Sequence, residues 1–219
     1  MARKKPGEAL DTDVEETRDS IVRMAHRLFM EQGYRAVSTR QIADACGLTQ
    51  PALYHYFRDK QGLYTEVIKE DIAKTRTALE RIARRSDSVP ERLRQVVRYL
   101  RSNADYDLGM MLHDMRQELG QQERITLHTL FQEGIIMPIA SIFEDGLKQG
   151  LLRPPQQSGV DAYTATHLFM SMLSRFIARP DKERRGIYTS DAEQAEVIVH
   201  ILLYGLAQPA PPEQTGADR

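Results

Sequence analysis

The chain has 219 residues, enough for one medium domain or for a small domain followed by a larger one. Its formal net charge of −1 at pH 7 excludes a polycation that binds nucleic acid through bulk charge, so any DNA contact must depend on where the basic residues stand. The single cysteine, Cys46, excludes an internal disulfide, and we interpret it as a small buried hydrophobe in a reducing compartment.

The sequence lacks the common motifs for targeting and for catalysis. The opening ARKKPGEALD lacks the apolar segment of a signal peptide. The longest apolar stretch, 134–143, contains Pro138 and is too short to cross a bilayer, so we expect a soluble, cytoplasmic protein. The motifs GxSxG, GxxxxGK[ST] and HExxH are missing, as are paired cysteines, so we expect no enzyme activity, no cofactor and no metal site.

The N-terminal region begins with a polar, basic stretch. We predict that residues 1–11 form a disordered arm, either a solvated tail or a segment that lies along DNA. Thr12 and Glu15 have the spacing of a capping box, and the apolar residues that follow recur with a helical period, which predicts a helix over 12–32. Gly33 would end that helix.

The segment 38–60 has the sequence of two short helices joined by a tight turn. Ser38 and Gln41 have the spacing of a capping box for the first helix, and Gly47 supplies the backbone freedom of a turn. Thr49 can cap the second helix, with Pro51 in its first turn. Two short helices in this arrangement predict a helix-turn-helix that enters DNA.

Residues from about 18 to 67 resemble the DNA-binding domain of the tetracycline-repressor (TetR) family of bacterial regulators. An ordered set of residues carries the resemblance: Ala25, Phe29, Gly33, Tyr34, Ser38, Thr39, Ile42, Ala43, Ala45, Gly47, Leu48, Leu53, Tyr54, His55, Tyr56, Phe57, Lys60 and Leu63. The rest of the chain can be compared with the family only in its helical layout. The resemblance implies a DNA-binding homodimer that commonly binds a small effector among its central helices.

The candidate DNA contacts lie on the two short helices and at the start of the next helix. They are Thr39, Arg40, Thr49, Gln50, Pro51, Tyr54, His55 and Lys60. Gln50 can bond adenine through two hydrogen bonds, and Pro51 can touch a thymine methyl. The resemblance implies phosphate contacts for Tyr54 and His55, although packing within the three-helix unit is an alternative role for both. Lys60 would add an ammonium group to a helix N-terminus.

Beyond residue 60 every segment has a helical period. We predict helices over 60–83, 90–102, 105–119, 121–148 (kinked at Pro138), 159–178 and 190–207. The prediction is an all-α fold of about nine helices, with a helix-turn-helix domain over 1–65, an effector-binding and dimerisation domain over 66–208 and a loose tail over 209–219. Helix 60–83 would be the lever between the two domains.

The last two predicted helices are apolar over most of their circumference, which favours burial on more than one side. We predict a four-helix dimer interface, with an ordinary internal core as the alternative. The interface candidates are Phe169, Leu173, Phe176, Ile198, Leu202 and Leu203.

Methionine and phenylalanine side chains gather in the central helices. They predict either core filling or a mostly apolar effector pocket suited to a hydrophobic or aromatic molecule. The pocket candidates are Met111, His113, Met115, Phe131, Phe169 and Met172.

These features together predict a sequence-specific transcriptional regulator. We expect a repressor that a small molecule releases from a palindromic operator. Alternatives are an activator, a regulator without an effector, a module with non-specific contacts, and a carrier or enzyme with a vestigial helix-turn-helix.

Overall fold

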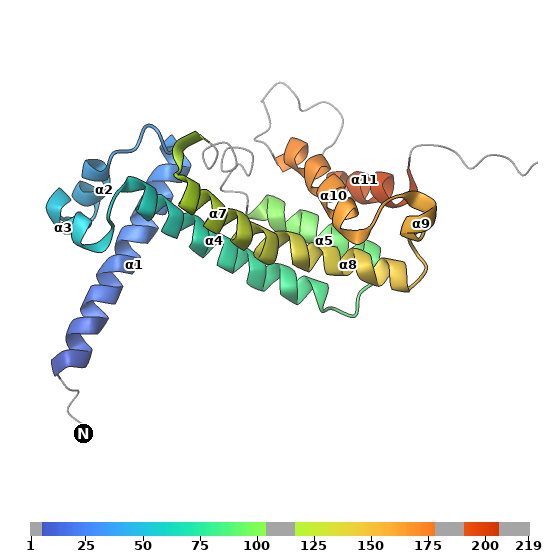
Figure 1. Cartoon of the computed structure of the whole chain (residues 1–219), viewed down its shortest axis with the longest axis horizontal. Helices are drawn as coiled ribbons and strands as arrows, with labels where there is room; N and C mark the ends of the chain where they lie inside the picture. The colour runs from blue at the N-terminus through green and yellow to red at the C-terminus, as the bar shows by residue number, and fades with distance from the viewer. Residues whose placement is uncertain (1–5, 104–116, 178–190, 206–219) are drawn as a thin grey trace, which may run out of the picture.

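The computed structural model describes residues 6–103, 117–177 and 191–205, and these ranges form helices without any strand (Figure 1). The molecule is elongated. Helices α1, α2 and α3 stand at one end, and the long helix α4 runs from them into a second group of helices. The predicted all-α fold is confirmed.

The N-terminal unit is built from α1 (Pro6–Gln32), α2 (Thr39–Ala45) and α3 (Gln50–Tyr56). Helix α1 begins six residues before the predicted start at Thr12, so the expected disordered arm is wrong for residues 6–11, and residues 1–5 lie outside the described part. A proline suits a first helical turn because its missing N–H has no partner there, which explains a start at Pro6.

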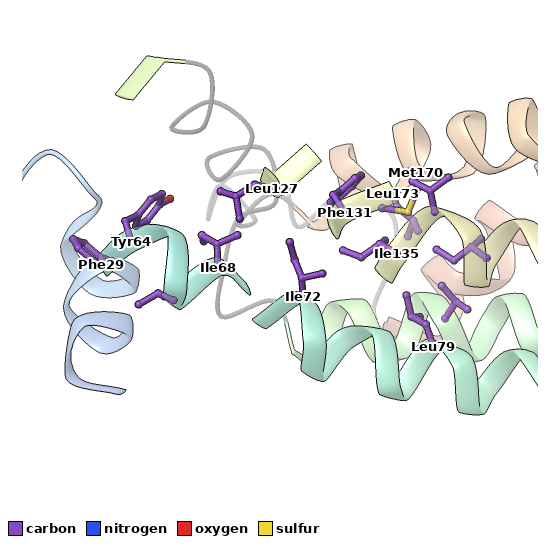
Figure 2. Packing of buried hydrophobic residues seen from close by; sticks show 14 of the residues in the cluster. Phe29, Tyr64, Ile68, Ile72, Leu79, Leu127, Phe131, Ile135, Met170 and Leu173 are labelled. Atoms are coloured by element: carbon purple, nitrogen blue, oxygen red, sulfur yellow. The ribbon is translucent and has the colours of Figure 1, made fainter. Parts of the chain in front are cut away.

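Helix α4 (Lys60–Ala83) has the predicted bounds. Asp59 caps it, because the Asp59 Oδ1 atom accepts a hydrogen bond of 2.7 Å from the backbone N–H of Gly62. Its apolar side chains join one buried cluster that extends from α1 to the far helices. Figure 2 shows Phe29 and Tyr64 at one end of that cluster and Leu79 at the other. The two halves of the chain therefore share a continuous core.

Helix α5 (Val89–Ser102) follows, and α7 (Gln121–Phe131), η1 (Gln132–Ile136) and α8 (Met137–Lys148) form one uninterrupted helical rod. The element η1 is a π-helical turn, in which the Met137 N–H donates to the Gln132 carbonyl. The π-helical turn ends at Ile136, two residues before Pro138. Pro138 has no backbone N–H, so it cannot donate the hydrogen bond that an α-helix would need at this position. The irregularity predicted at Pro138 takes this form.

The rod α7–η1–α8 is, by length and composition alone, long and apolar enough to cross a membrane. Most of its apolar side chains nevertheless lie in the common core, where the rod packs against α4, α5 and α10, and only Ile125 and Met137 are more than half exposed. This is the arrangement of a core helix in a soluble protein.

The chain ends with the short helix α9 (Pro155–Ser158), α10 (Ala162–Ile177) and α11 (Asp191–Tyr204). Helix α10 starts three residues later than predicted, because the side chain of Asp161 accepts a 2.7 Å hydrogen bond from the Thr164 N–H and so caps it. The helix predicted over 105–119 and the tail over 209–219 lie largely or wholly outside the described residues.

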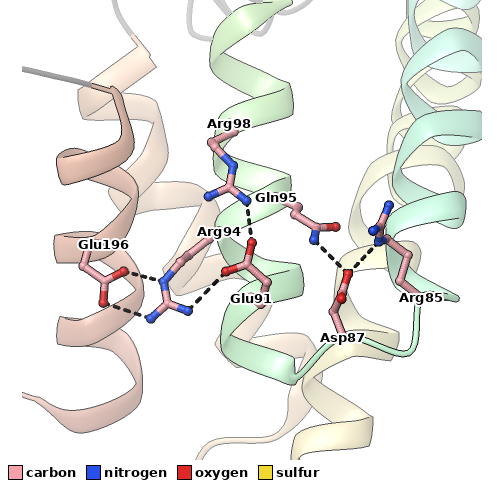
Figure 3. A network of polar contacts seen from close by, with 7 residues as sticks. All are labelled: Arg85, Asp87, Glu91, Arg94, Gln95, Arg98 and Glu196. Atoms are coloured by element: carbon pink, nitrogen blue, oxygen red, sulfur yellow. Dashed lines mark hydrogen bonds and ion pairs between the residues drawn. The ribbon is translucent and has the colours of Figure 1, made fainter.

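Polar contacts attach α11 to α5 (Figure 3). Arg94 of α5 holds both carboxylate oxygens of Glu196 of α11 and also reaches Glu91, which in turn pairs with Arg98 at 2.5 Å. Hydrogen bonding to Glu196 raises the pKa of Arg94, and the pKa of Glu196 is correspondingly lowered, so both groups stay charged near neutral pH.

Candidate nucleic-acid interface

The helix-turn-helix is fixed by local caps and one tight turn. The Ser38 N–H donates to the Gln41 side chain at 2.7 Å, and the Gln41 N–H donates to the Ser38 hydroxyl at 3.2 Å, which completes the predicted capping box. Gly47, with φ of +68°, makes the turn, and Thr49 accepts from the Ala52 N–H at 3.3 Å as the cap of α3. These contacts hold α3 at a set angle to α2.

The core behind α3 consists of fully buried side chains from all neighbouring helices. Ile42 of α2 and Leu53 of α3 pack with the apolar stripe of α1 and with Leu63 of α4. Because the apolar face of α3 is used in this way, its polar residues must face outward.

The structure places the predicted DNA contacts at one end of the molecule. Arg40, Thr49, Pro51 and His55 are exposed, Tyr54 is 44% exposed, and Gln50 and Lys60 are half-buried. The exception is Thr39, which is only 8% exposed. A direct contact of the Thr39 side chain with DNA, as the sequence predicts, does not fit this burial.

Thr39 instead belongs to a polar network with two other candidates. The Gln50 Nε2 atom lies 2.9 Å from the Thr39 Oγ1 atom and 3.4 Å from the Tyr54 hydroxyl, and the two hydroxyl oxygens lie 3.2 Å apart. The network joins the start of α2 to the exposed face of α3. Sequence reasoning named all three residues but not the contacts between them.

Cations near the interface rest on aromatic rings. The Lys60 Nζ atom lies 4.1 Å from the ring centroid of Tyr34, and the Arg18 guanidinium lies 5.3 Å from the ring centroid of Phe57. Sequence reasoning missed Arg18, which also pairs with Glu66 of α4 at 2.6 Å. Tyr34 orients the Lys60 ammonium group, which stays half-buried at the N-terminus of α4.

One further contact joins α1 to α4, where the His26 Nε2 atom lies 3.0 Å from the Asp71 Oδ2 atom. Within α4, Lys69 pairs with Glu66 at 2.7 Å and so supports the partner of Arg18. Burial raises the pKa of Glu66, but hydrogen bonds from Lys69 and Arg18 outweigh burial, and the net pKa is lowered. Arg18 and His26 therefore attach α1 to α4 at two points.

A second connection between the two halves runs through the residues before α7. The Arg35 Nε atom, in the loop after α1, pairs with the Glu118 Oε1 atom at 2.6 Å without involving α4, and the Gly120 N–H donates to the Oε1 atom of Gln61, at the start of α4, at 3.2 Å. Leu119 between them is buried in the core. We call residues 118–120 the corner. It lies directly before α7, and its partner Arg35 is 83 residues away in sequence, so no local pattern indicated the contact.

The predicted effector pocket is only partly within the described residues. Met111, His113 and Met115 lie outside them. Phe131 and Phe169 are buried in the common core and Met172 is half-buried against it. A surface groove of about 500 Å³ lies elsewhere, between α4 and the η1–α8 segment. Its lining residues are Arg76, Glu80, Ala83, Arg84, Glu133, Met137, Pro138 and Ser141, and no predicted pocket residue is among them.

The structure corrects the predicted dimer interface. Phe169, Leu173 and Ile198 are fully buried within a single chain, so they belong to its core and cannot contact a partner. Leu202 and Leu203 remain half-buried, and the side chain of Phe176 lies outside the described part. Apolar side chains do face outward on the same two helices, namely Tyr163, Leu168 and Tyr204, which are 50%, 48% and 59% exposed.

Metal binding finds no support in the ranges that the structure describes. Those ranges contain no group of three or more His, Cys, Asp or Glu side chains that could hold an ion. The pKa of the Cys46 thiol is raised by burial, which fits the predicted role of a small packed side chain.

Comparison with known proteins gives a consistent result for the N-terminal region. The family model described as bacterial regulatory proteins, tetR family, matches residues 21–67. The HTH-type transcriptional regulator AcrR of Shigella flexneri is 43% identical over 67 residues, which cover 31% of this chain and 29% of AcrR. The similarity to such curated relatives spans 26% to 34% of their length.

Solved structures resemble most of the chain. The TetR family transcriptional regulator PfmR from Thermus thermophilus is 29% identical, with a TM-score of 0.65 and coverage of 86% of this chain and 99% of PfmR. FadR from Bacillus subtilis, solved in complex with stearoyl-CoA, is 16% identical, with a TM-score of 0.69 and coverage of 86% and 98%. At that identity the second likeness shows a shared fold alone.

Proposed function

We propose that the chain is a regulatory protein of the tetR family, namely a cytoplasmic, sequence-specific transcriptional repressor without enzyme activity. The observation that carries the proposal is the outward face of the helix-turn-helix. Exposed polar side chains stand there on two short helices that are held by caps and by a fully buried core.

In this proposal α3 enters the major groove of operator DNA. Gln50, Thr49 and Pro51 at its N-terminus meet base edges, whereas Tyr54 and His55 face the phosphates. Arg40 adds a charge at the start of α2, and Lys60 adds its ammonium group at the start of α4. This division gives a few specific contacts and a larger number that only position the domain.

One such unit reads few base pairs, so we propose a two-fold dimer on a palindrome. The exposed apolar side chains of α10 and α11 support the assignment of the interface, because large apolar groups that face outward mark contact surfaces. Leu168→Arg should produce monomers in sedimentation velocity at micromolar concentration. A dimer of unchanged mass would contradict this placement.

A small apolar effector would release the DNA. We propose that it binds near Phe131 and Met172, together with Met111, His113 and Met115 of the predicted helix 105–119. Two routes support transmission to the DNA-binding unit: α4, whose core contacts run through both halves, and the corner with its contacts to Arg35 and Gln61. An effector that prefers the altered arrangement would change the spacing of the two α3 helices.

Selection of bound fragments from genomic DNA tests the proposed function. The expected product is a palindrome that the protein binds at least about a thousandfold more tightly than scrambled DNA at the same salt concentration. A ratio near one would refute a sequence-specific regulator and leave a non-specific DNA contact. Release of the palindrome by an apolar metabolite extract would separate the effector question from DNA binding.

A further inference from the structure

The contacts among Thr39, Gln50 and Tyr54 determine how the recognition helix presents its only amide side chain. The three polar groups form a closed triangle, with sides of 2.9, 3.4 and 3.2 Å. Thr39 closes it from α2, and Gln50 and Tyr54 lie one turn apart on α3.

A count of protons determines which way the Gln50 amide faces. Three contacts need three hydrogen atoms. With the Gln50 Nε2 atom toward the hydroxyls, the amide supplies two protons and one hydroxyl supplies the third, so all three contacts are hydrogen bonds. If the amide were reversed, only the two hydroxyl protons would remain, and two oxygen atoms would face each other without a proton. The donor orientation is therefore the satisfied one.

The remaining hydroxyl proton belongs to the exposed member of the network. Thr39 is buried, and its hydroxyl has one other polar neighbour within the network, the Tyr54 oxygen, to which it can donate. Tyr54 is 44% exposed and keeps its own proton for an outside acceptor such as a phosphate oxygen. Hydrogen bonds in such a chain polarise one another, so the Tyr54 contact and the Gln50 orientation support each other.

The carbonyl oxygen of the Gln50 side chain is the part of the amide that is left to contact DNA. Both amide protons are engaged within the protein, and Oε1 accepts no hydrogen bond from the part of the chain that the structure describes. We propose that Gln50 reads a base only as a hydrogen-bond acceptor, and that Thr39 and Tyr54 are the positioning residues that impose this role. The proposal rests on the proposed function and specifies the chemistry of one of its contacts.

An acceptor selects a particular feature of the major groove. Only the exocyclic amino groups, N6 of adenine and N4 of cytosine, donate a hydrogen bond there. The O6 and N7 atoms of guanine and the O4 atom of thymine are acceptors and would repel the Gln50 oxygen. The two-bond contact with adenine predicted from the sequence needs an amide N–H for N7, and the network uses both of these protons.

Base analogues test the proposal on the full-length protein. The base pair that Gln50 contacts is the one whose discrimination is lost in Gln50→Ala. If the base is adenine, purine in its place (no amino group) should weaken binding about tenfold, and 7-deazaadenine (no N7) should leave it within about twofold. If the base is cytosine, 2-pyrimidinone in its place should give the tenfold loss. Equal losses with both adenine analogues, or a contact with guanine, would overturn the proposal.

Two variants separate positioning from phosphate contact. Tyr54→Phe should relax discrimination at the same base pair about as much as Gln50→Ala, because an amide with a free N–H can rotate to meet other bases. His55→Ala, on the same exposed face but outside the network, should weaken all sequences equally and leave discrimination intact. Unchanged discrimination in Tyr54→Phe would overturn the positioning role. A wild-type protein without any preference for the palindrome would instead refute the proposed function.

Discussion

Helix α4 and the rod α7–η1–α8 lie close together at Gly134 in the π-helical turn. A Cβ atom at Gly134 would lie 2.7 Å from the Ile72 Cγ2 atom and 3.4 Å from the Arg76 Cβ atom. Carbon atoms prefer about 3.5–4.0 Å, so Gly134→Ala must push the two helices apart by about 1 Å. Overpacking of this kind costs about 1–3 kcal/mol, and the helix preference of alanine returns about 1 kcal/mol.

The expected result is a net loss of about 1 kcal/mol, seen as a fall in melting temperature of about 3 °C in thermal unfolding. The displaced point lies 12 residues from Lys60, or about 18 Å along α4, so operator affinity should fall as well. Gly62→Ala is the matched control, because its Cβ atom would meet Asp59 at an ordinary 3.5 Å. If Gly134→Ala is as stable as Gly62→Ala, the close packing assigned to α4 and η1 is refuted. Adding Ile72→Ala, which removes the clashing atom, should restore more stability than the sum of the single changes predicts.

Three further predictions follow from charged side chains. Lys60→Ala should weaken binding to all DNA sequences and lower the salt dependence of log K by about one unit. Lys148→Ala, which removes an exposed charge at the far end of α8, should change neither. A double-mutant cycle with Arg35→Ala and Glu118→Ala should give a coupling of about 0.5 kcal/mol in urea unfolding, since Arg35 is largely exposed; zero coupling would exclude the corner contact from the linkage. Because the pKa of Glu66 is lowered in the folded state, its stabilisation is fully present above the ordinary value of 4.5 and is lost as the pH falls through the folded value. Glu66→Gln should therefore be destabilising at pH 7, and a difference that persists unchanged into strong acid would contradict the ion-pair account.

Signals in the sequence predicted the helix ends that depend only on neighbouring residues. The bounds of α4 follow from Asp59 as a cap and from the apolar period, and the capping box at Ser38 is present as predicted. A cap depends on residues within one turn, so a single sequence contains nearly all the information that it needs. The start of α1 is the exception, since Pro6 and Thr12 both carry signals of a helix N-terminus.

Contacts between distant residues were not accessible from the sequence. A helix that is apolar nearly all round has the same pattern whether its second face meets its own chain or a partner. Phe169, Leu173 and Ile198 were therefore assigned to an interface although they fill the core of one chain. The contact between Arg35 and Glu118 has no periodic signal for the same reason.

The candidate DNA-binding surface lies between these two cases. Its residues could be named because they occupy fixed places on two capped helices. The roles of Thr39 and Gln50 could not be predicted, because they depend on the angle at which α2 crosses α3. That angle sets which hydroxyl each amide proton meets, and hence which hydrogen-bonding groups remain for DNA.

In the proposed complex, two copies of the helix-turn-helix, held at a fixed spacing, read two half-sites together. The most direct test is the affinity for the selected palindrome before and after insertion of five base pairs between the half-sites. The insertion moves one half-site to the opposite face of the duplex, because a full turn takes about 10 base pairs. We expect a loss of affinity of at least about a hundredfold at constant salt. Equal affinity for both DNA molecules would contradict it.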